Sequence, residues 1–245
     1  MKDTRTLNCK FSIIIPVLHE SDKVNSLIAH LYAQYSDEDC EIIIVEGNQN
    51  RDTIRVIPHK DIVVLVSETG RGCQMNAGAA IARGEILIFL HADTQLPVNA
   101  LDHISHLLEQ QEYVGGAFDL AIRSHKLVFK IIAHVASLRS HVTRLPYGDQ
   151  TIFLRKEYFD KIGGYREMPL MEDVELMQRI KRRGDKICIL SDKVVTSPRR
   201  WEKEGALYCT LRNWIIMTLY LIGISPSTLA KYYRSNEPVK NLNDR

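Results

Sequence analysis

The sequence predicts an α/β protein in which a mostly parallel central sheet is flanked by helices and followed by a C-terminal helical extension. Short apolar runs alternate with helical hydrophobic periodicity through the first half of the chain, as they do where helices cover a parallel sheet. The run EILIFL at residues 85–90 is apolar at successive positions, which indicates a strand buried on both faces. No segment is rich enough in Pro, Gly or Ser to divide the chain.

The first half contains the clearest element signals. Ser21 and Asp22 are predicted to cap a helix whose apolar residues recur at the i, i+3, i+4, i+7 spacing as far as Tyr35. Gly84 ends a helix of small residues, and Pro97 fits the first turn of another. These patterns predict strands at residues 11–17, 41–45, 62–66 and 85–90, and helices at 21–35, 72–83 and 97–110.

The second half is predicted to mix helices with fewer strands. Strands are expected at 115–122 and 186–190, with a loop entering a strand over 147–154, and helices at 126–139, 156–162, 172–183 and 202–223. The polar tail after Lys231 is expected to be loose. We therefore expect one domain over residues 11–200 and a helical extension over 201–233 that packs on the domain or on a membrane surface.

Composition narrows the class of protein. The chain has 245 residues, 45% of them hydrophobic, with 32 Lys and Arg against 30 Asp and Glu, which excludes disordered, collagenous and wholly membrane-embedded proteins. The small net charge of +2 argues against a nucleic-acid partner. Five scattered cysteines without a Cys-x-x-Cys pair, and a first apolar run too short for export, predict a cytoplasmic protein, with the inner face of the cell membrane left open.

Polar residues follow three predicted strands where each strand ends. They are Glu20, Glu46 and the pair His91 and Asp93. Open α/β sheets bind ligands at the carboxyl ends of their strands, so three carboxylates on one rim indicate a ligand site, although a single one would more often cap a helix. Asp93 stands too far before the next helix to cap it directly, and Mg²⁺ or Mn²⁺ prefers carboxylate and phosphate oxygens. Whether His91 is a second ligand or only a polar residue at the strand end stays open.

Eight motifs occur in a fixed order along the chain. They are SIIIPV from Ser12, EIIIVEG from Glu41, GRGCQMNAGA from Gly70, FLHADT from Phe89, YGDQ from Tyr147, GGY from Gly163, LMEDVEL from Leu170 and SPRRW from Ser197. Together they resemble the family 2 glycosyltransferases of the GT-A (Rossmann-like) fold, and they are especially similar to a compact bacterial branch with an HADT metal motif. The resemblance covers about residues 11 to 230.

The resemblance implies a metal-dependent, inverting hexosyltransferase that uses a nucleotide-sugar donor and Mg²⁺ or Mn²⁺. Asp93 matches the second Asp of the family's Asp-x-Asp metal motif, and His91 stands where the first Asp usually lies. Glu46 replaces the Asp that usually contacts the nucleobase and ribose. Asp173 matches the catalytic base that deprotonates the acceptor, although carboxylates are favoured at any helix start.

The remaining site residues follow from the same motifs. Arg200 is assigned a catalytic role in stabilising the departing diphosphate; a solvated basic turn at Arg199 and Arg200 is the alternative. Arg71 lies between two glycines at a predicted helix start, where a cation can reach a phosphate or a base; a plain helix-entry turn is the alternative. Trp201 is expected to offer an aromatic platform to the acceptor. The donor site is thus expected to comprise Pro16, Glu20, Glu46, Arg71, Asn76, Arg199 and Trp201.

The stretch between Arg212 and Lys231 is uncharged but interrupted by Gly223 and Pro226. A core helix, an interfacial helix and a membrane span are the alternatives, in that order. We expect weak peripheral membrane contact through residues 214–224 and the flanking cations, and a hydrophobic or lipid-like acceptor such as a carotenoid carboxylate, a polyprenyl phosphate or a glycolipid. A homodimer, the sugar and the nucleobase stay open.

Two other functions remain as alternatives. A nucleotidyltransferase that makes sugar nucleotides would need a Gly-rich loop with Arg and Lys after the first strand, where this chain has Pro16 followed by Val-Leu-His-Glu. A non-catalytic sugar-nucleotide-binding protein would need neither Asp93 nor Asp173.

Overall fold

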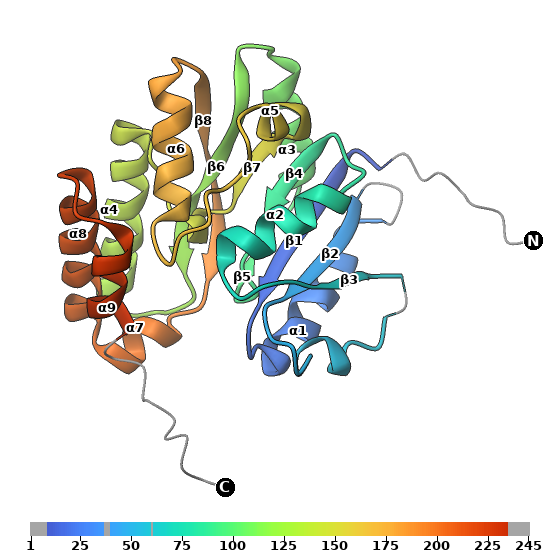
Figure 1. Cartoon of the computed structure of the whole chain (residues 1–245), viewed down its shortest axis with the longest axis horizontal. Coiled ribbons are helices and arrows are strands. Elements are labelled where there is room, and N and C mark those ends of the chain that lie inside the picture. Colours follow the sequence, from blue (N-terminus) through green and yellow to red (C-terminus); the bar gives the residue numbers. More distant parts are fainter. Residues whose placement is uncertain (1–8, 37–39, 60, 235–245) are drawn as a thin grey trace, which may run out of the picture.

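The computed structural model describes residues 9–36, 40–59 and 61–234. Within them, one eight-stranded sheet has the order β3-β2-β1-β4-β7-β6-β8-β5 (Figure 1). The strands are β1 (Phe11–Val17), β2 (Cys40–Glu46), β3 (Val63–Val66), β4 (Ile86–Phe89), β5 (Thr94–Gln95), β6 (Tyr113–Ile122), β7 (Ile152–Arg155) and β8 (Lys186–Thr196). The helices are α1 (Ser21–Tyr32), α2 (Arg71–Ile81), α3 (Ala100–Glu109), α4 (Leu127–Thr143), α5 (Lys156–Lys161), α6 (Glu172–Arg182), α7 (Arg199–Glu204), α8 (Ala206–Leu221) and α9 (Pro226–Arg234), with short 3₁₀ turns η1 (Ile54–Val56) and η2 (Gly148–Gln150).

The predicted fold class is confirmed. β1 pairs in parallel with β2 and β4, β2 with β3, and β6 with β8, whereas β7 and the short β5 run against their neighbours. The central strands are buried on both faces because helices cover both. Side chains of β1 alternate accordingly: Ile13 and Ile15 pack with α1 and α3, while Ile14 packs with α2 and α6.

Helix α2 lies unusually close to the sheet because it carries Gly78 at the contact. A Cβ atom at Gly78 would lie 2.5 Å from Cγ2 of Ile14 and 3.1 Å from Cγ2 of Val45. The absence of a side chain therefore sets how deep α2 sits, and with it the position of Arg71 at the start of the helix.

Strand β8 is longer than its sequence pattern predicts. The polar residues Ser191 and Asp192 look like the end of a strand, yet β8 continues to Thr196. The pairing with β6 shifts between Phe118 opposite Leu190 and Asp119 opposite Lys193, so the two polar residues are accommodated in a bulge.

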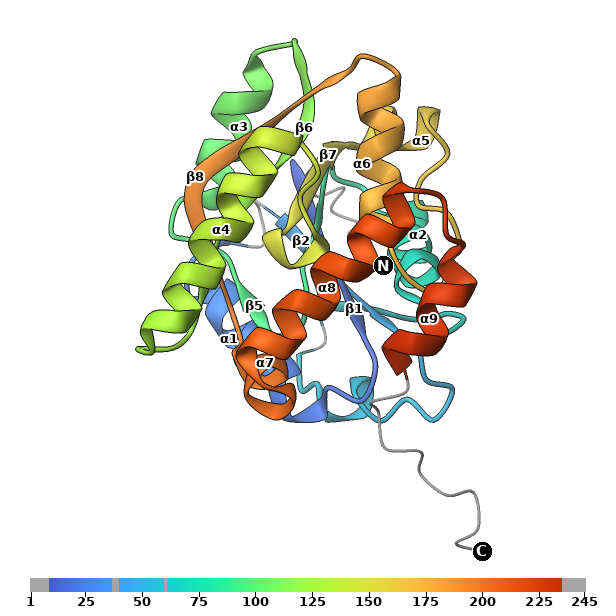
Figure 2. The same ribbon diagram turned by 90° about the vertical axis from the view of Figure 1, so that its left-hand side faces the viewer.

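The C-terminal helical region is present, although it is more divided than expected. Gly205, with φ 90°, separates α7 from α8, and Pro226 begins α9, which the sequence did not predict. Ile216 of α8 and Leu229 of α9 pack with Leu170, just before α6, so this region lies against the domain (Figure 2). Within the described residues, no helix has both the length and the apolar character needed to cross a membrane.

Replacing Gly78 by Ala tests the close packing of α2. In an open helix this change adds about 1 kcal/mol of stability, but here the new methyl group would overlap Ile14. We expect Gly78→Ala to lower the free energy of unfolding by about 1–3 kcal/mol, measured by urea denaturation. A stabilised variant would contradict the packing argument.

Candidate functional site

The predicted site residues gather at the edge where the parallel strands end. β1, β2 and β4 finish there, and the first residues of α2 and α6 face the same edge. Arg71 is the first residue of α2, and its guanidinium lies 3.9 Å from the carboxylate of Glu172, the first residue of α6. Burial and the charge of neighbouring Asp173 raise the pKa of Glu172 above its usual range, against the opposing effect of Arg71.

Asp173 is held by a main-chain amide rather than by a side chain. Gly148 donates its N–H to Oδ2 of Asp173 at 2.6 Å. A Cβ atom at Gly148 would lie 2.9 Å from Nε2 of His91 and 3.5 Å from Oδ2 of Asp173, so the backbone of η2 fits between the two side chains. The end of β4, the turn η2 and the start of α6 therefore meet at one point.

His91 is neutral in this position. Burial, and then the positive charge of Arg71, lower the pKa of its imidazole to about 3. The ring can therefore offer a lone pair to a ligand or accept a hydrogen bond near neutral pH, but it supplies no positive charge.

Asp149 is a site residue that the motif comparison did not assign. Its Oδ1 is buried and has no hydrogen-bond partner among the described residues. Burial raises its pKa to about 6; the charges of Asp173 and Asp93 also raise it, and Arg139 and Arg71 oppose them. The YGDQ motif contains Asp149 and could have drawn attention to it. Only the fold shows that Asp149 lies among these charges.

Glu46 and Glu20 organise the loop after β2. The fully buried carboxylate of Glu46 accepts hydrogen bonds from the amides of Thr53, at 2.9 Å, and Asn48, at 3.3 Å. The main-chain amide of Glu20 donates to the hydroxyl of Thr53 at 3.1 Å. Pro16 lies opposite Val45 in the parallel pair. Pro16, Glu20 and Glu46, which were predicted to bind the nucleotide-sugar donor, therefore lie together. The carboxylate of Glu46 orders the loop after β2 through its hydrogen bonds.

Two residues predicted to bind the nucleotide sugar, Asn76 and Trp201, contact other parts of the chain. The amide group of Asn76 donates to the carbonyl of Tyr165 and accepts from its N–H, each at 2.8 Å, so it fixes the GGY loop. The ring of Trp201 packs against Phe129 with 6.4 Å between centroids, and it borders the core beneath α4. This packing does not support Trp201 as an open platform for an acceptor, because its ring is engaged by the core.

The two arginines before Trp201 lie in different surroundings. Arg199 is paired with Glu20, at 3.2 Å, and keeps most of its side chain exposed. The guanidinium of Arg200 stacks 4.3 Å from the ring centroid of Tyr233 in α9, and its Nε lies 3.7 Å from Glu204. Only Arg199 is joined to the strand-end residues by a direct ion pair.

The prediction that Arg212 contacts a membrane surface is wrong. Arg212 is buried, pairs with Glu204 at 2.5 Å and stacks 4.9 Å from the same Tyr233 ring. A buried, paired guanidinium is not free to meet lipid headgroups, whereas Lys231 is exposed.

The strand-end residues fit a metal ion only if a ligand shares it. Across residues 9–36, 40–59 and 61–234, no three His, Cys, Asp or Glu side chains are arranged to hold a metal. Mg²⁺ and Mn²⁺ are commonly bound by one or two carboxylates together with phosphate oxygens. Asp93, the unpaired oxygen of Asp149 and the neutral ring of His91 suit that arrangement.

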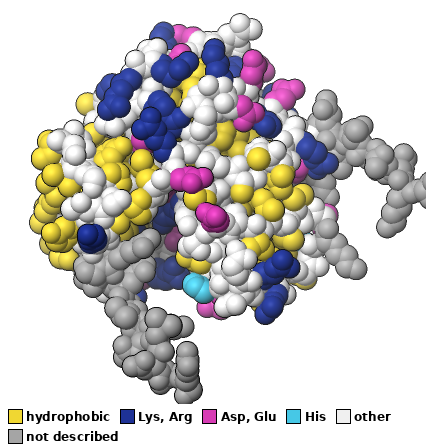
Figure 3. All heavy atoms as spheres, in the orientation of Figure 1, with side chains coloured by type: hydrophobic (Ala, Val, Ile, Leu, Met, Phe, Trp, Pro, Cys, Tyr) yellow, Lys and Arg dark blue, Asp and Glu magenta, His cyan; other side chains and the backbone are white. Residues whose placement is uncertain are grey.

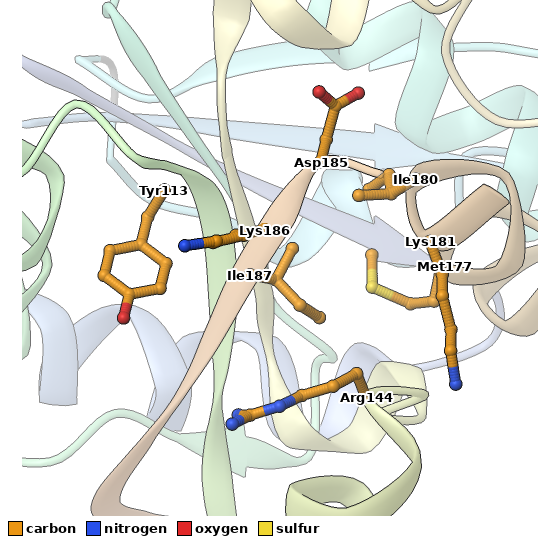
Figure 4. A pocket seen from close by; sticks show the side chains of 8 residues that line it. All are labelled: Tyr113, Arg144, Met177, Ile180, Lys181, Asp185, Lys186 and Ile187. Carbon is orange, nitrogen blue, oxygen red and sulfur yellow. The ribbon is translucent and has the colours of Figure 1, made fainter. Parts of the chain in front are cut away.

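Two open pockets lie at the opposite edge of the sheet. One, of about 240 Å³, lies where β6 and β8 begin and is lined by Tyr113, Arg144, Met177 and Lys186 among others (Figure 4). Its one carboxylate, Asp185, is already bonded to Tyr158 and Arg183. The other, of about 660 Å³, is lined by the residues that begin β4 and end β7. Neither contains a predicted site residue, so the strand-end cluster remains the candidate functional site.

Comparison with known proteins now identifies the family. Residues 12–168 match the family described as Glycosyl transferase family 2. The chain belongs to this family. The matched range contains Asp93 and Asp149 and ends before Asp173, so the role of Asp173 stays a prediction.

A curated relative of this family 2 protein is an uncharacterized glycosyltransferase, alr2836, of Nostoc sp. (strain PCC 7120). The two are 30% identical over 113 residues, which are 43% of this chain and 35% of the relative. The match thus spans about a third of that relative's length.

Two solved structures share the fold of this family 2 protein. A mannosyltransferase of Pyrobaculum calidifontis in complex with GDP-Man and Mn²⁺ superposes with a TM-score of 0.65 at 19% identity, over 91% of this chain and 67% of its own. Residues 1–349 of TarS from S. aureus superpose with a TM-score of 0.59 at 16% identity, over 93% and 73% of the two chains. At such identities the likeness shows the GT-A fold alone.

The stability gained by replacing Asp149 with Asn should depend on pH. An unfolded Asp has a pKa of about 4, whereas burial raises that of Asp149 to about 6; the folded state therefore binds the proton more tightly and loses stability as pH rises through this window. Because Asn is never charged, we expect the variant to gain about 2 kcal/mol over the native chain at pH 8 and nothing at pH 4.

The measurement is urea denaturation in EDTA at both pH values. Asp102→Asn, at an exposed position of α3, is the matched control and should show no such difference. A gain for the Asp149 variant that is equal at pH 4 and pH 8 would contradict the burial of a charged carboxylate.

Proposed function

We propose that this chain transfers a hexose, with inversion, from a nucleotide-diphosphate donor to a hydrophobic or lipid-like acceptor, and that residues 11–200 form the transferase domain. The observation that carries the proposal is the meeting of Asp173, Gly148 and His91 beside Arg71, at the strand ends of a family 2 chain. The compact branch with the HADT motif remains the proposed subgroup.

Donor binding would combine a metal with the loops at the strand ends. Mg²⁺ or Mn²⁺, held by Asp93 with Asp149 and His91 as candidate further ligands, would neutralise the diphosphate as negative charge develops on it. Arg71 and Arg199 are exposed cations at the same edge and suit the phosphates. The Mn²⁺ and GDP-Man in the Pyrobaculum structure support this arrangement.

Asp173 would act as the general base. Gly148 donates to its Oδ2 and Val174 donates to its Oδ1, so main-chain amides fix both oxygens, and a helix N-terminus favours negative charge. The acceptor hydroxyl would give its proton to this carboxylate while its oxygen forms the new bond to the anomeric carbon, and the bond to the diphosphate breaks. The base must lie on the face of the sugar opposite the leaving group, which gives inversion.

Two observations favour transfer over the alternatives. The loop after β1 begins with Leu18 and His19, with no Gly-rich triphosphate loop of the kind a nucleotidyltransferase needs. A protein that only bound sugar nucleotides would have no use for Asp173 fixed by a main-chain donor.

Metal-dependent donor binding is tested at Asp93. We expect UDP or GDP to bind native protein more tightly with Mn²⁺ than in EDTA, because a metal held by Asp93 would supply positive charge for the diphosphate. Asp93→Asn should lose that metal-dependent part, measured by titration calorimetry, while its circular dichroism stays native. Asp102→Asn, an exposed carboxylate of α3, is the control. Equal affinity in EDTA, or in the Asp93 variant, would refute the metal assignment.

The base is tested at Asp173. Asp173→Asn should slow transfer by about a hundredfold or more, as removal of a general base does, while donor binding stays unchanged. The readout is nucleoside diphosphate released in the presence of acceptor lipids. Glu172→Gln, the adjacent residue on the same helix turn, is the matched control and should cost less. Near-normal turnover of the Asn variant would make Asp173 a helix-start residue only.

A further inference from the structure

Helices α4 and α8 carry a continuous apolar surface on their outer sides. The two helices lie against each other on one side of the molecule (Figure 2). We define the α4–α8 face by Leu127, Ile131 and Val142 of α4 and Leu207, Leu211 and Trp214 of α8, whose exposed fractions range from 47 to 78%. In Figure 3, hydrophobic side chains gather at the left of the molecule, where these two helices lie.

This face is not needed to hold the helices on the domain. The inner side of α4 contributes Phe129 and Ala133 to one core, and the inner side of α8 contributes Ile216 and Met217 to others. The outer apolar side chains therefore lie in addition to a core contact that is already made. Monomeric proteins rarely expose apolar patches of this extent without a partner.

The segments that carry the face contain no carboxylates. Residues 120–148 and 205–234 contain no Asp or Glu, although the chain has 30 of them. The segments instead carry exposed cations at Arg123, Lys126, Lys130, Arg144 and Lys231. Apolar side chains with a rim of cations, and without carboxylates, complement an anionic lipid surface.

Other occupants fit less well. A second copy of the chain, docked symmetrically, would place the same cations opposite one another. Nucleic acid would require several aromatic stacking surfaces, whereas five of the six defining side chains are aliphatic and Trp214 alone among them is aromatic. Trp214 and Tyr208, both half-exposed, are the residue types that lie at headgroup level. Helix α8 has 16 residues, too few to cross a bilayer.

We propose that the α4–α8 face binds the surface of a bilayer containing anionic phospholipids, with both helices lying along it. Ile216 of α8 packs with Leu170, and Met171, which precedes α6, packs beside it. Binding through this face would therefore hold the start of α6 near the lipid. The inference needs no sugar transfer, so its failure and that of the proposed function are separable.

The first experiment is co-sedimentation of the full chain with vesicles. We expect binding to phosphatidylcholine vesicles that contain phosphatidylglycerol, weaker binding as salt rises, and little binding to phosphatidylcholine alone. Leu211→Glu and Trp214→Glu should lose most of it. Val98→Glu, which replaces an apolar side chain that is 67% exposed at another site, is the matched control and should bind as the native chain does.

Charge is tested separately, at exposed lysines of this surface. Lys126→Gln with Lys130→Gln should weaken binding to the anionic vesicles by about thirtyfold, since each cation near such a surface contributes about 1 kcal/mol. Lys161→Gln, an exposed lysine of α5, should have no effect. Thermal unfolding of every variant checks that the fold is kept.

Three results would overturn the proposal. The first is no binding of native protein at low salt, and the second is binding that the lysine pair leaves unchanged. The third is a dimer, seen by light scattering, that Leu211→Glu converts to a monomer, because the face would then be an interface between two copies of the chain.

Discussion

Burial of the central sheet on both faces constrains everything else in this molecule. Ile13, Ile14 and Ile88 are completely buried, so charged groups cannot lie along these strands and must lie at their ends. The close approach of α2 through Gly78 then fixes where Arg71 stands, and α6, packed on the same face of the sheet, delivers Asp173 to the same edge. The position of the charges is thus a consequence of where apolar side chains had to go.

The sequence predicted well those features that local pattern determines. The strand bounds at residues 11–17 agree with β1, because a β-branched run buried on both sides has no competing structure. Asp93 was found because a carboxylate follows a strand that must be buried. The strand ends Glu20 and Glu46 do come together, since parallel neighbours share their carboxyl edge.

Features that depend on distant contacts were missed or misjudged. The carboxylate of Asp149 is buried, with no hydrogen-bond partner for Oδ1 among the described residues, because η2 folds against His91 and α6. No local sequence pattern predicts that contact. Arg212 and Trp201 look like surface residues in sequence, yet Arg212 is buried beside Glu204 and Trp201 is half-buried against Phe129. The polar residues Ser191 and Asp192 suggested the end of a strand, but pairing with β6 carries β8 past them in a bulge.

The hydrogen bond from Gly148 to Asp173 has a consequence for how this site can evolve. The donor is a main-chain amide, so substitutions of the surrounding side chains do not remove this hydrogen bond to Asp173. The exception is position 148 itself, where any side chain would wedge into His91. The residues around Asp173 can therefore diversify while the backbone keeps its carboxylate in place.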